Sequence, residues 1–372
     1  MAKWLFVFIL IAALIGVGYI ISLPKPAIQK ATAPVNITET LQSNTTARTL
    51  RTRVFASGLD GARDLQFTPG GTLLVSLTRN GQVAAIKNGQ TKTILTGLRN
   101  PHGMAFRDGK LYVAQETQVV RYAWDEASQT PTQEKVIMQL PAGGRHFTRS
   151  LEFDTKGRLF VSIGSTCDTC FEKDERTAAV MVTDSDGNNP TVIAKGLRNA
   201  VFLKRHPATG DIYMTEMGRD FLGDTTPPDE INILKDNGDY GWPVCYGNRV
   251  YDKEFNSGKP EKYCATTIEP FYNLPSHVAP LGLTFITSPL FPQDQQNDLL
   301  VALHGSWNSS VPVGYKIVRL HIQHGQVVDM VDFKTDFRQH DTVVGRPVDV
   351  EFDSQGRLYI SDDKAGLVYS ME

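Results

Sequence analysis

The sequence lacks an extended stretch of apolar residues at helical spacing, and it lacks an excess of basic charge. The absence of long amphipathic helices disfavours the α/β enzyme folds. Lysine and arginine together number 38 against 40 aspartate and glutamate residues, which leaves a formal net charge of −2. A protein that binds nucleic acid or another polyanion generally carries a clear basic excess. Composition therefore argues against a nucleic-acid partner.

Cysteine is scarce, with four residues in the chain, and no histidine follows the Cys-x-x-Cys pair. Phe171 stands after Cys167 and Cys170, which disfavours covalent attachment of a c-type haem. The other two cysteines, 245 and 264, are too far apart for the usual spacing of a four-cysteine zinc site. An even count in an exported chain predicts two disulfides, most simply the two local pairs, although three connectivities are possible.

The N-terminus carries the one long apolar run. Residues Trp4 to Leu23 contain no charge and are long enough to cross a bilayer core of roughly 30 Å. We expect residues 1–23 to be either a secretory signal or an uncleaved membrane anchor, and both remain open. The polar residues 24–50 predict a flexible tether. The rest of the chain is then exported to the periplasm or cell surface, with membrane contact only through this segment.

One hairpin unit recurs six times along the chain. Each copy has two short β-prone runs around a turn that usually centres on glycine, and the copies lie at residues 58–76, 97–114, 149–162, 196–215, 279–302 and 345–361. Repeats at this spacing predict a radial array of small sheets. We therefore predict an all-β fold over residues 51–372, a six-bladed β-propeller of four-stranded antiparallel blades. A β-sandwich would not explain the repetition.

The repeat also predicts where chemistry lies. Each unit opens with polar residues just before its first strand, so these positions should meet at one end of the central channel. They include Arg63, His102, Arg198, His277 and Arg346. The fourth unit is followed by an acidic loop from Glu216 to Pro228, and a loop of that length is usually functional.

Several motifs resemble those of the glucose/sorbosone dehydrogenases over about residues 50–371. They read GLRNPHGMAF, RHFTRSLEFDTKGRLFVSIGSTCDTC, GLRNAVFLKRHPATGDIYMTEMGRD, HGSWNSSVPVGYKIVRL and GRPVDVEFDSQGRLYISDD. The chain looks closest to the L-sorbosone dehydrogenase-like branch. That resemblance implies a six-bladed propeller that uses pyrroloquinoline quinone (PQQ) and Ca²⁺ to oxidise an aldose or aldehyde sugar, passing electrons to a separate quinone or cytochrome.

His146 is the candidate general base. A neutral imidazole can take a proton from a sugar hydroxyl near neutral pH. The resemblance implies that His146 does so while hydride passes to the quinone. It also implies that Arg198 and Asn199 stabilise the negative charge that develops on the cofactor. The dipeptide recurs at Arg99-Asn100, so a purely structural role in the turn is the alternative.

Further cofactor contacts follow from the resemblance. PQQ carries three carboxylates, and the resemblance implies that Arg346, and less directly Lys316, binds them. Trp307 is a candidate for stacking on the flat ring system, or for packing between blades. The sequence departs from the glucose-oxidising relatives at Val348, where they have a second arginine. The expected PQQ site therefore carries less positive charge in this chain.

The loop after Glu216 is the candidate Ca²⁺ site. Calcium takes six to eight oxygen ligands. The resemblance implies that Gly218 and Arg219 provide backbone carbonyls, and Glu216 is the third candidate ligand. These acidic residues could instead be merely solvated.

Two other functions remain open from the sequence. One is a non-catalytic exported propeller that binds a sugar or a protein. The other is a metal-dependent hydrolase of the lactonase type, which would need asparagine and carboxylate side chains that converge on an ion in the channel.

Overall fold

The computed structural model describes residues 37–40 and 49–372. The predicted signal or anchor, residues 1–23, and most of the predicted tether lie outside the described residues. Within the described ranges, no helix combines the length and apolar character that a bilayer crossing requires.

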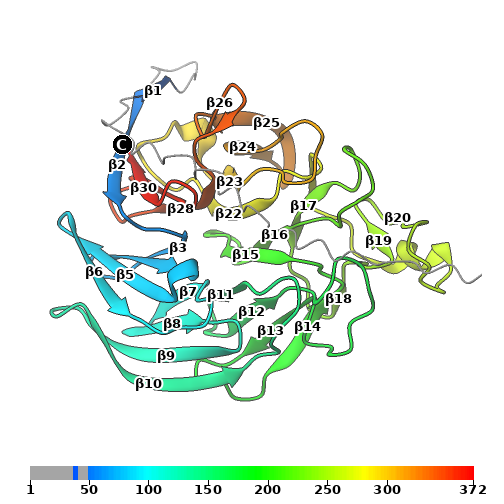
Figure 1. The fold of residues 1–372 in the computed structure, drawn as a ribbon, viewed down its shortest axis with the longest axis horizontal. Helices are drawn as coiled ribbons and strands as arrows, with labels where there is room; N and C mark the ends of the chain where they lie inside the picture. Colours follow the sequence, from blue (N-terminus) through cyan, green and yellow to red (C-terminus); the bar gives the residue numbers. More distant parts are fainter. Residues whose placement is uncertain (1–36, 41–48) are drawn as a thin grey trace, which may run out of the picture. The chain divides into compact units, whose positions relative to one another are not determined.

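Six antiparallel sheets surround a common centre (Figure 1). Blade 1 comprises β3 (Ala62–Phe67), β4 (Leu73–Leu77), β5 (Gln82–Lys87) and β6 (Gln90–Leu95). Blade 2 comprises β7 (Met104–Arg107), β8 (Lys110–Ala114), β9 (Gln118–Asp125) and β10 (Thr130–Gln139). Blade 3 comprises β11 (Arg149–Phe153), β12 (Leu159–Ile163), β13 (Ala179–Thr183) and β14 (Thr191–Lys195), with the short parallel β18 (Gly238–Asp239) at its outer edge.

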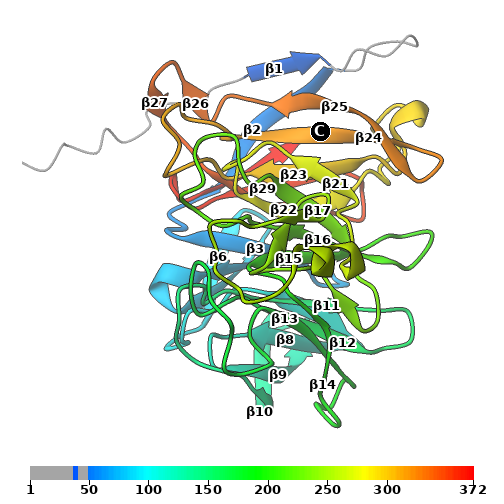
Figure 2. The same cartoon turned by 90° about the vertical axis from the view of Figure 1, so that its right-hand side faces the viewer.

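The remaining three blades follow the same order. Blade 4 comprises β15 (Ala200–Arg205), β16 (Ile212–Glu216), β17 (Asp229–Ile233) and β21 (Tyr272–Leu274). Blade 5 comprises β22 (Pro280–Phe285), β23 (Leu299–Leu303), β24 (Lys316–Gln323) and β25 (Gln326–Lys334), whose strands lie side by side in Figure 2. Blade 6 comprises β28 (Pro347–Phe352), β29 (Leu358–Asp362), β30 (Leu367–Met371) and the N-terminal β2 (Thr49–Ser57). The predicted six-bladed β-propeller is confirmed.

Short hairpins and 3₁₀ turns lie outside the six blades. Two hairpins are formed by β19 (Cys245–Tyr246) with β20 (Val250–Tyr251) and by β26 (Arg338–Gln339) with β27 (Thr342–Val343). Among the described residues the helical elements are three short 3₁₀ turns, η1 (Thr78–Asn80), η2 (Glu261–Thr266) and η3 (Gln293–Gln295). The two predicted local disulfides, Cys167–Cys170 and Cys245–Cys264, are both present.

One strand falls inside the predicted tether. Residues Ile37–Thr40 form β1, which pairs antiparallel with β2. Isoleucine and threonine favour strands, and the outer edge of β2 offers unpaired backbone groups. The tether prediction rested on polar composition alone, and composition does not register a neighbouring sheet edge.

The turn between the first two strands of a blade is encoded by a repeated local sequence. Asp154, after β11, accepts hydrogen bonds from the Lys156 and Arg158 amides at 2.9 and 2.8 Å. Gly157 closes the turn with φ +82°, a conformation that side chains with a Cβ rarely adopt. Asp353 and Gly356 repeat the arrangement in blade 6. The aspartate therefore sets the hairpin register through its own side chain.

Carboxylates also link neighbouring inner strands, which lie in different sheets. Asp64 of β3 accepts the Met104 amide of β7 at 2.9 Å. Asp349 of β28 accepts the Leu65 amide of β3 at 2.8 Å. Each bond satisfies an inner-strand N–H, and it fixes one blade against the next.

A substitution at Leu50 tests whether β2 closes the ring of blades. It lies on β2, is 1% exposed, and packs with β28, β29 and β30 in the core of blade 6. We expect Leu50→Ala to lower the free energy of unfolding by about 2–5 kcal/mol, because it leaves a cavity in that core. On the same strand Val54 is 40% exposed, so Val54→Ala should change it by less than about 0.5 kcal/mol. Equilibrium urea unfolding measures both, and equal effects would contradict a ring closed through β2.

Candidate active site

A pocket of about 230 Å³ lies where the inner strands of blades 3, 4 and 5 begin. It is lined by Arg145, His146, Arg198, Asn199, Met217, Gly218, Asp220, Asp229, His277, Ala279, Trp307 and Asn308. A second cavity, of about 310 Å³, lies at the opposite ends of the inner strands and includes Glu152, Lys204 and Glu351. The expectation that polar entry residues share one end is borne out for His146, Arg198, Asn199 and His277.

His146 is held in one tautomer. Its Nδ1 lies 2.9 Å from Ser165 Oγ and 3.2 Å from the Ser165 carbonyl oxygen. Since Ser165 Oγ donates its own proton to the Cys167 carbonyl at 2.6 Å, it accepts from Nδ1–H. The tautomer leaves Nε2 unprotonated, and no described residue hydrogen-bonds to it. Burial, together with the charges of Arg198 and Arg145, lowers the pKa of His146 to about 3, so the imidazole is neutral and can accept a proton.

Arg198 is 4% exposed and held at three of its nitrogens. Nη2 donates to Asp168 Oδ1 at 2.7 Å and to Asp220 Oδ2 at 3.1 Å. Nε donates to the Asp168 carbonyl at 3.1 Å, and Nη1 donates to the Met217 carbonyl at 3.3 Å. The guanidinium is therefore pre-positioned at the pocket wall, as electrostatic stabilisation of a developing charge requires. The two carboxylates offset part of its charge.

Arg145 and Asp220 are site residues that the sequence interpretation missed. Arg145 Nη2 donates to Asp220 Oδ2 at 2.5 Å, and its guanidinium lies 5.7 Å from the centre of the Trp307 ring. Asp220 Oδ1 also accepts from Asn308 at 2.7 Å. Arg145 precedes His146 in sequence, so its position beside the candidate base was the available signal. The pocket thus has a second cation besides Arg198.

Two side-chain oxygens in and beside the pocket lack a hydrogen-bond donor among the described residues: Asn199 lines the pocket, and Glu216 lines the small adjoining cavity that shares Gly218 with it. Asn199 Oδ1 and Glu216 Oε2 are buried, and among the described residues neither has a hydrogen-bond partner. The other Glu216 oxygen accepts the Asn199 amide at 2.9 Å. Buried oxygen atoms without a donor, such as Asn199 Oδ1 and Glu216 Oε2, are the kind of ligand that a hard cation such as Ca²⁺ takes.

Other buried acids lie close to Glu216. Burial raises the pKa of Glu216 well above its usual range, raises that of Asp229 to about 6 and raises that of Glu230 to about 7. Asp229 accepts the Gly218 amide at 2.8 Å and the Ala279 amide at 2.9 Å. It therefore fixes the loop that carries Gly218. The predicted loop from Glu216 is confirmed as residues 217–228, between β16 and β17.

The other predicted site residues lie at different distances from the pocket. Trp307 lines it and is 64% exposed. Arg219 pairs with buried Asp252 at 2.7 Å, and its side chain donates to the Asp220 carbonyl. Trp242, in the segment that follows β18, donates its ring N–H to the Asp168 carbonyl at 3.2 Å.

Lys316 and Arg346 are not among the residues that line the pocket. Lys316 pairs with Asp332 of the outer strand β25 at 2.5 Å. Arg346 donates to the carbonyls of His304 and Gly305, at 3.1 and 2.5 Å, so it supports the segment that leads to Trp307.

A polar network in the channel contains the remaining entry residues. Arg63 bridges His102 at 3.3 Å and Asp363 at 3.2 Å, and Asp363 accepts from His304 at 2.9 Å. Burial lowers the pKa of His304 to about 4. Arg63, His102 and Arg346 thus gather with one another rather than in the pocket, because buried charges require partners.

Three comparisons place the chain among known proteins. The family described as TrAA12-like matches residues 44–372. An uncharacterised protein of Borreliella burgdorferi is 32% identical over 300 residues, which cover 76% of this chain and 78% of that protein. A pyrroloquinoline quinone-dependent sugar dehydrogenase of Hypocrea jecorina is 24% identical over 388 residues, 86% of this chain and 87% of that protein. The holo form of the pyranose dehydrogenase PQQ domain from Coprinopsis cinerea has the same fold, with a TM-score of 0.76, 21% identity and coverage of 92% and 98%.

The protonation state of His146 can be measured directly. With a pKa of about 3, it should keep a neutral, Nδ1-protonated ring between pH 8 and pH 5. A freely solvated imidazole would pass through half-protonation near pH ~6.5. Nitrogen chemical shifts of His146 in the unloaded protein, assigned by comparison with His146→Asn, report both quantities. A midpoint between pH 6 and 7 would contradict this account of the site.

Proposed function

Because this chain belongs to the TrAA12-like family, we propose that it is a PQQ-dependent sugar dehydrogenase that oxidises an aldose or aldehyde sugar, as glucose and sorbosone dehydrogenases do. The observation that carries the proposal is the neutral, Nδ1-protonated His146, which lines a pocket together with two arginines and Asn199. The relatives named as PQQ-dependent sugar and pyranose dehydrogenases support it.

His146 is the general base. Its Nε2 accepts the proton of a sugar hydroxyl while the carbon that bears this hydroxyl loses a hydride. Ser165 holds Nδ1–H throughout, so the imidazolium that forms remains oriented by the same two acceptors. Arg198 and Arg145 disfavour the imidazolium, which makes proton release to solvent after each turnover favourable.

The pocket fits both cofactors. Arg145 and Arg198 are cations for the carboxylates of PQQ, and the exposed Trp307 offers an aromatic face. Glu216 Oε2, Asn199 Oδ1 and the Gly218 and Arg219 carbonyls are the oxygens that would hold Ca²⁺. When bound, PQQ supplies a two-electron acceptor for the hydride, and Ca²⁺ polarises it.

Val348 does not leave the pocket without a second cation for the PQQ carboxylates. Its side chain is fully buried in the core between blades 4, 5 and 6. Arg145, which lines the pocket from the segment before β11, provides the second cation instead.

Export and electron transfer complete the proposal. Two disulfides suit an oxidising compartment, which agrees with delivery to the periplasm or cell surface. Each turnover leaves two electrons on the protein, so a separate quinone or cytochrome must remove them.

One observation favours a second function. Asn199 and Glu216 each keep a buried side-chain oxygen without a donor, and an asparagine with a carboxylate is also what a lactonase-type, metal-dependent hydrolase requires around its ion. Hydrolysis of a sugar lactone with Ca²⁺ alone, in the absence of PQQ, would establish this alternative.

Reconstitution tests the base. The protein loaded with PQQ and Ca²⁺ should reduce an artificial dye when an aldose is added, and both additions should be needed. His146→Asn should lower kcat by about 10²–10⁴-fold, since a general base contributes that much. His324→Asn is the matched control, because His324 is an exposed turn residue at φ +52° that asparagine tolerates. Equal rates for the two variants would refute His146 as the base.

The cation site has its own test. Glu216→Gln removes a charge from the proposed ligand set, so Ca²⁺ affinity of the unloaded protein should fall by about tenfold or more. Glu152→Gln, made at the second cavity, should leave it unchanged. Isothermal titration with Ca²⁺ measures both variants, and an unchanged affinity in Glu216→Gln would place the ion elsewhere.

A further inference from the structure

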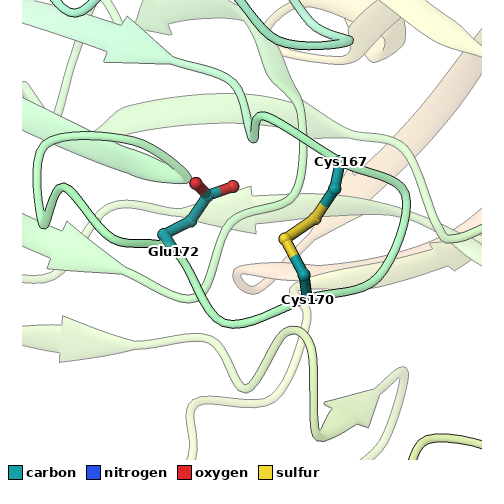
Figure 3. A group of neighbouring side chains, drawn as sticks. All are labelled: Cys167, Cys170 and Glu172. Atoms are coloured by element: carbon teal, nitrogen blue, oxygen red, sulfur yellow. A yellow bond between two sulfur atoms is a disulfide. The ribbon is translucent and has the colours of Figure 1, made fainter.

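The loop between β12 and β13 contains a small covalent ring next to the site. Cys167 and Cys170 are joined by a disulfide, with 6.2 Å between their Cα atoms (Figure 3). Glu172 follows on the same loop and accepts hydrogen bonds from the Thr166 amide at 2.6 Å and the Thr166 hydroxyl at 2.8 Å. The same carboxylate accepts the Thr177 hydroxyl at 2.9 Å. The loop is therefore closed on itself at two places.

Asp168, inside the ring, holds Arg198 from two sides. Its Oδ1 accepts from Arg198 Nη2, and its carbonyl accepts from Arg198 Nε. Oδ1 also accepts the Asp220 amide at 3.0 Å. Burial opposes ionisation of Asp168, but the hydrogen bond from Asp220 and the charge of Arg198 lower its pKa, so the carboxylate is charged. One ring residue thus fixes the orientation of the guanidinium.

Cys167, at the start of the ring, acts on His146 through Ser165. The Cys167 carbonyl accepts the Ser165 hydroxyl proton, which obliges Ser165 Oγ to be an acceptor toward His146 Nδ1–H. The direction of both hydrogen bonds is set by that carbonyl. If it turned away, Ser165 Oγ could donate to Nδ1 of the other tautomer, which carries its proton on Nε2, and only the Ser165 carbonyl, 3.2 Å from Nδ1, would still favour the Nδ1-protonated form.

Stabilisation of the fold alone does not explain the ring. In the chain-entropy account, a disulfide stabilises more when it closes a longer loop. Cys167 and Cys170 are separated by 3 positions, against 19 for Cys245 and Cys264. The short ring should therefore stabilise the folded state less than the longer one does. It does, however, contact two residues of the site.

We propose that the Cys167–Cys170 ring is a positioning element. It fixes the proton-accepting tautomer of His146 through Ser165 and the orientation of Arg198 through Asp168. This proposal rests on the proposed function. The disulfide holds the Cys167 carbonyl and the Asp168 side chain in place within this loop.

Two variants separate these contacts from general stability. Cys167→Ser with Cys170→Ser opens the ring, and Cys245→Ser with Cys264→Ser is the control for loss of a disulfide. In the unloaded protein, the nitrogen shifts of His146 should change from one tautomer to a mixture in the first pair and remain those of one tautomer in the control. The loss of melting temperature should be smaller in the first pair than in the control.

A second comparison tests Asp168 without touching the disulfide. Asp168→Ala should lower the affinity of the unloaded protein for PQQ, measured by absorbance titration, and Asp168→Asn should recover part of it because the amide oxygen can still accept from Arg198. Asp174→Ala is the control, since Asp174 lies on the same loop and pairs with Arg176. In the loaded enzyme, opening the ring should lower kcat by about tenfold while KM changes less, because the base is misoriented.

The outcomes are distinct. If the unmutated protein reduces no dye, the proposed function fails, and the tautomer of His146 still decides the positioning role. A single unchanged His146 tautomer in the open-ring variant, or equal PQQ affinity in Asp168→Ala and Asp174→Ala, would overturn the proposal.

Discussion

The antiparallel pairing of β2 with β30 is the contact on which the rest of the structure depends. It places the first strand of the ring in the last blade, with Thr52 opposite Met371 and Val54 opposite Tyr369. Once the ring is closed, the six inner strands start at the same end of the channel. Arg63 and Asp363, 300 positions apart in sequence, can then form an ion pair. The same closure brings loops from blades 3, 4 and 5 to one pocket.

Burial of charge is the second constraint, and it explains why the pocket and the channel differ. In the channel, Arg63 pairs with Asp363, which also accepts from His304, and Arg63 Nε alone of this set lacks a partner among the described residues. At the pocket, Glu216 and Asn199 each keep one buried oxygen without a donor. Leaving such atoms unpaired is costly, so a ligand that supplies the missing partner would be stabilised there.

The sequence predicted the fold well because the fold is repetitive. Six copies of one hairpin carry their own turn residues, and Asp154 and Asp353 perform the same local task in two blades. The position of His146 and Arg198 at one pocket followed from the same repeat. Side-chain direction did not: Lys316 turns to Asp332, and Val348 packs into the core. Arg145 and Asp168 were missed since their roles depend on loops whose conformation no local pattern specifies.

The electrostatics of the pocket unite the base with the cation site. Burial shifts the pKa of His146 downward and the pKa values of Glu216 and Asp229 upward, so it favours the neutral form of all three groups. A divalent cation held by Glu216 would reverse the two carboxylate shifts, because it stabilises ionised carboxylates. Its positive charge would add to that of Arg198 and Arg145 and disfavour the imidazolium of His146 further. Cation binding therefore ionises the acids and keeps His146 neutral, and it lowers the basicity of Nε2 at the same time.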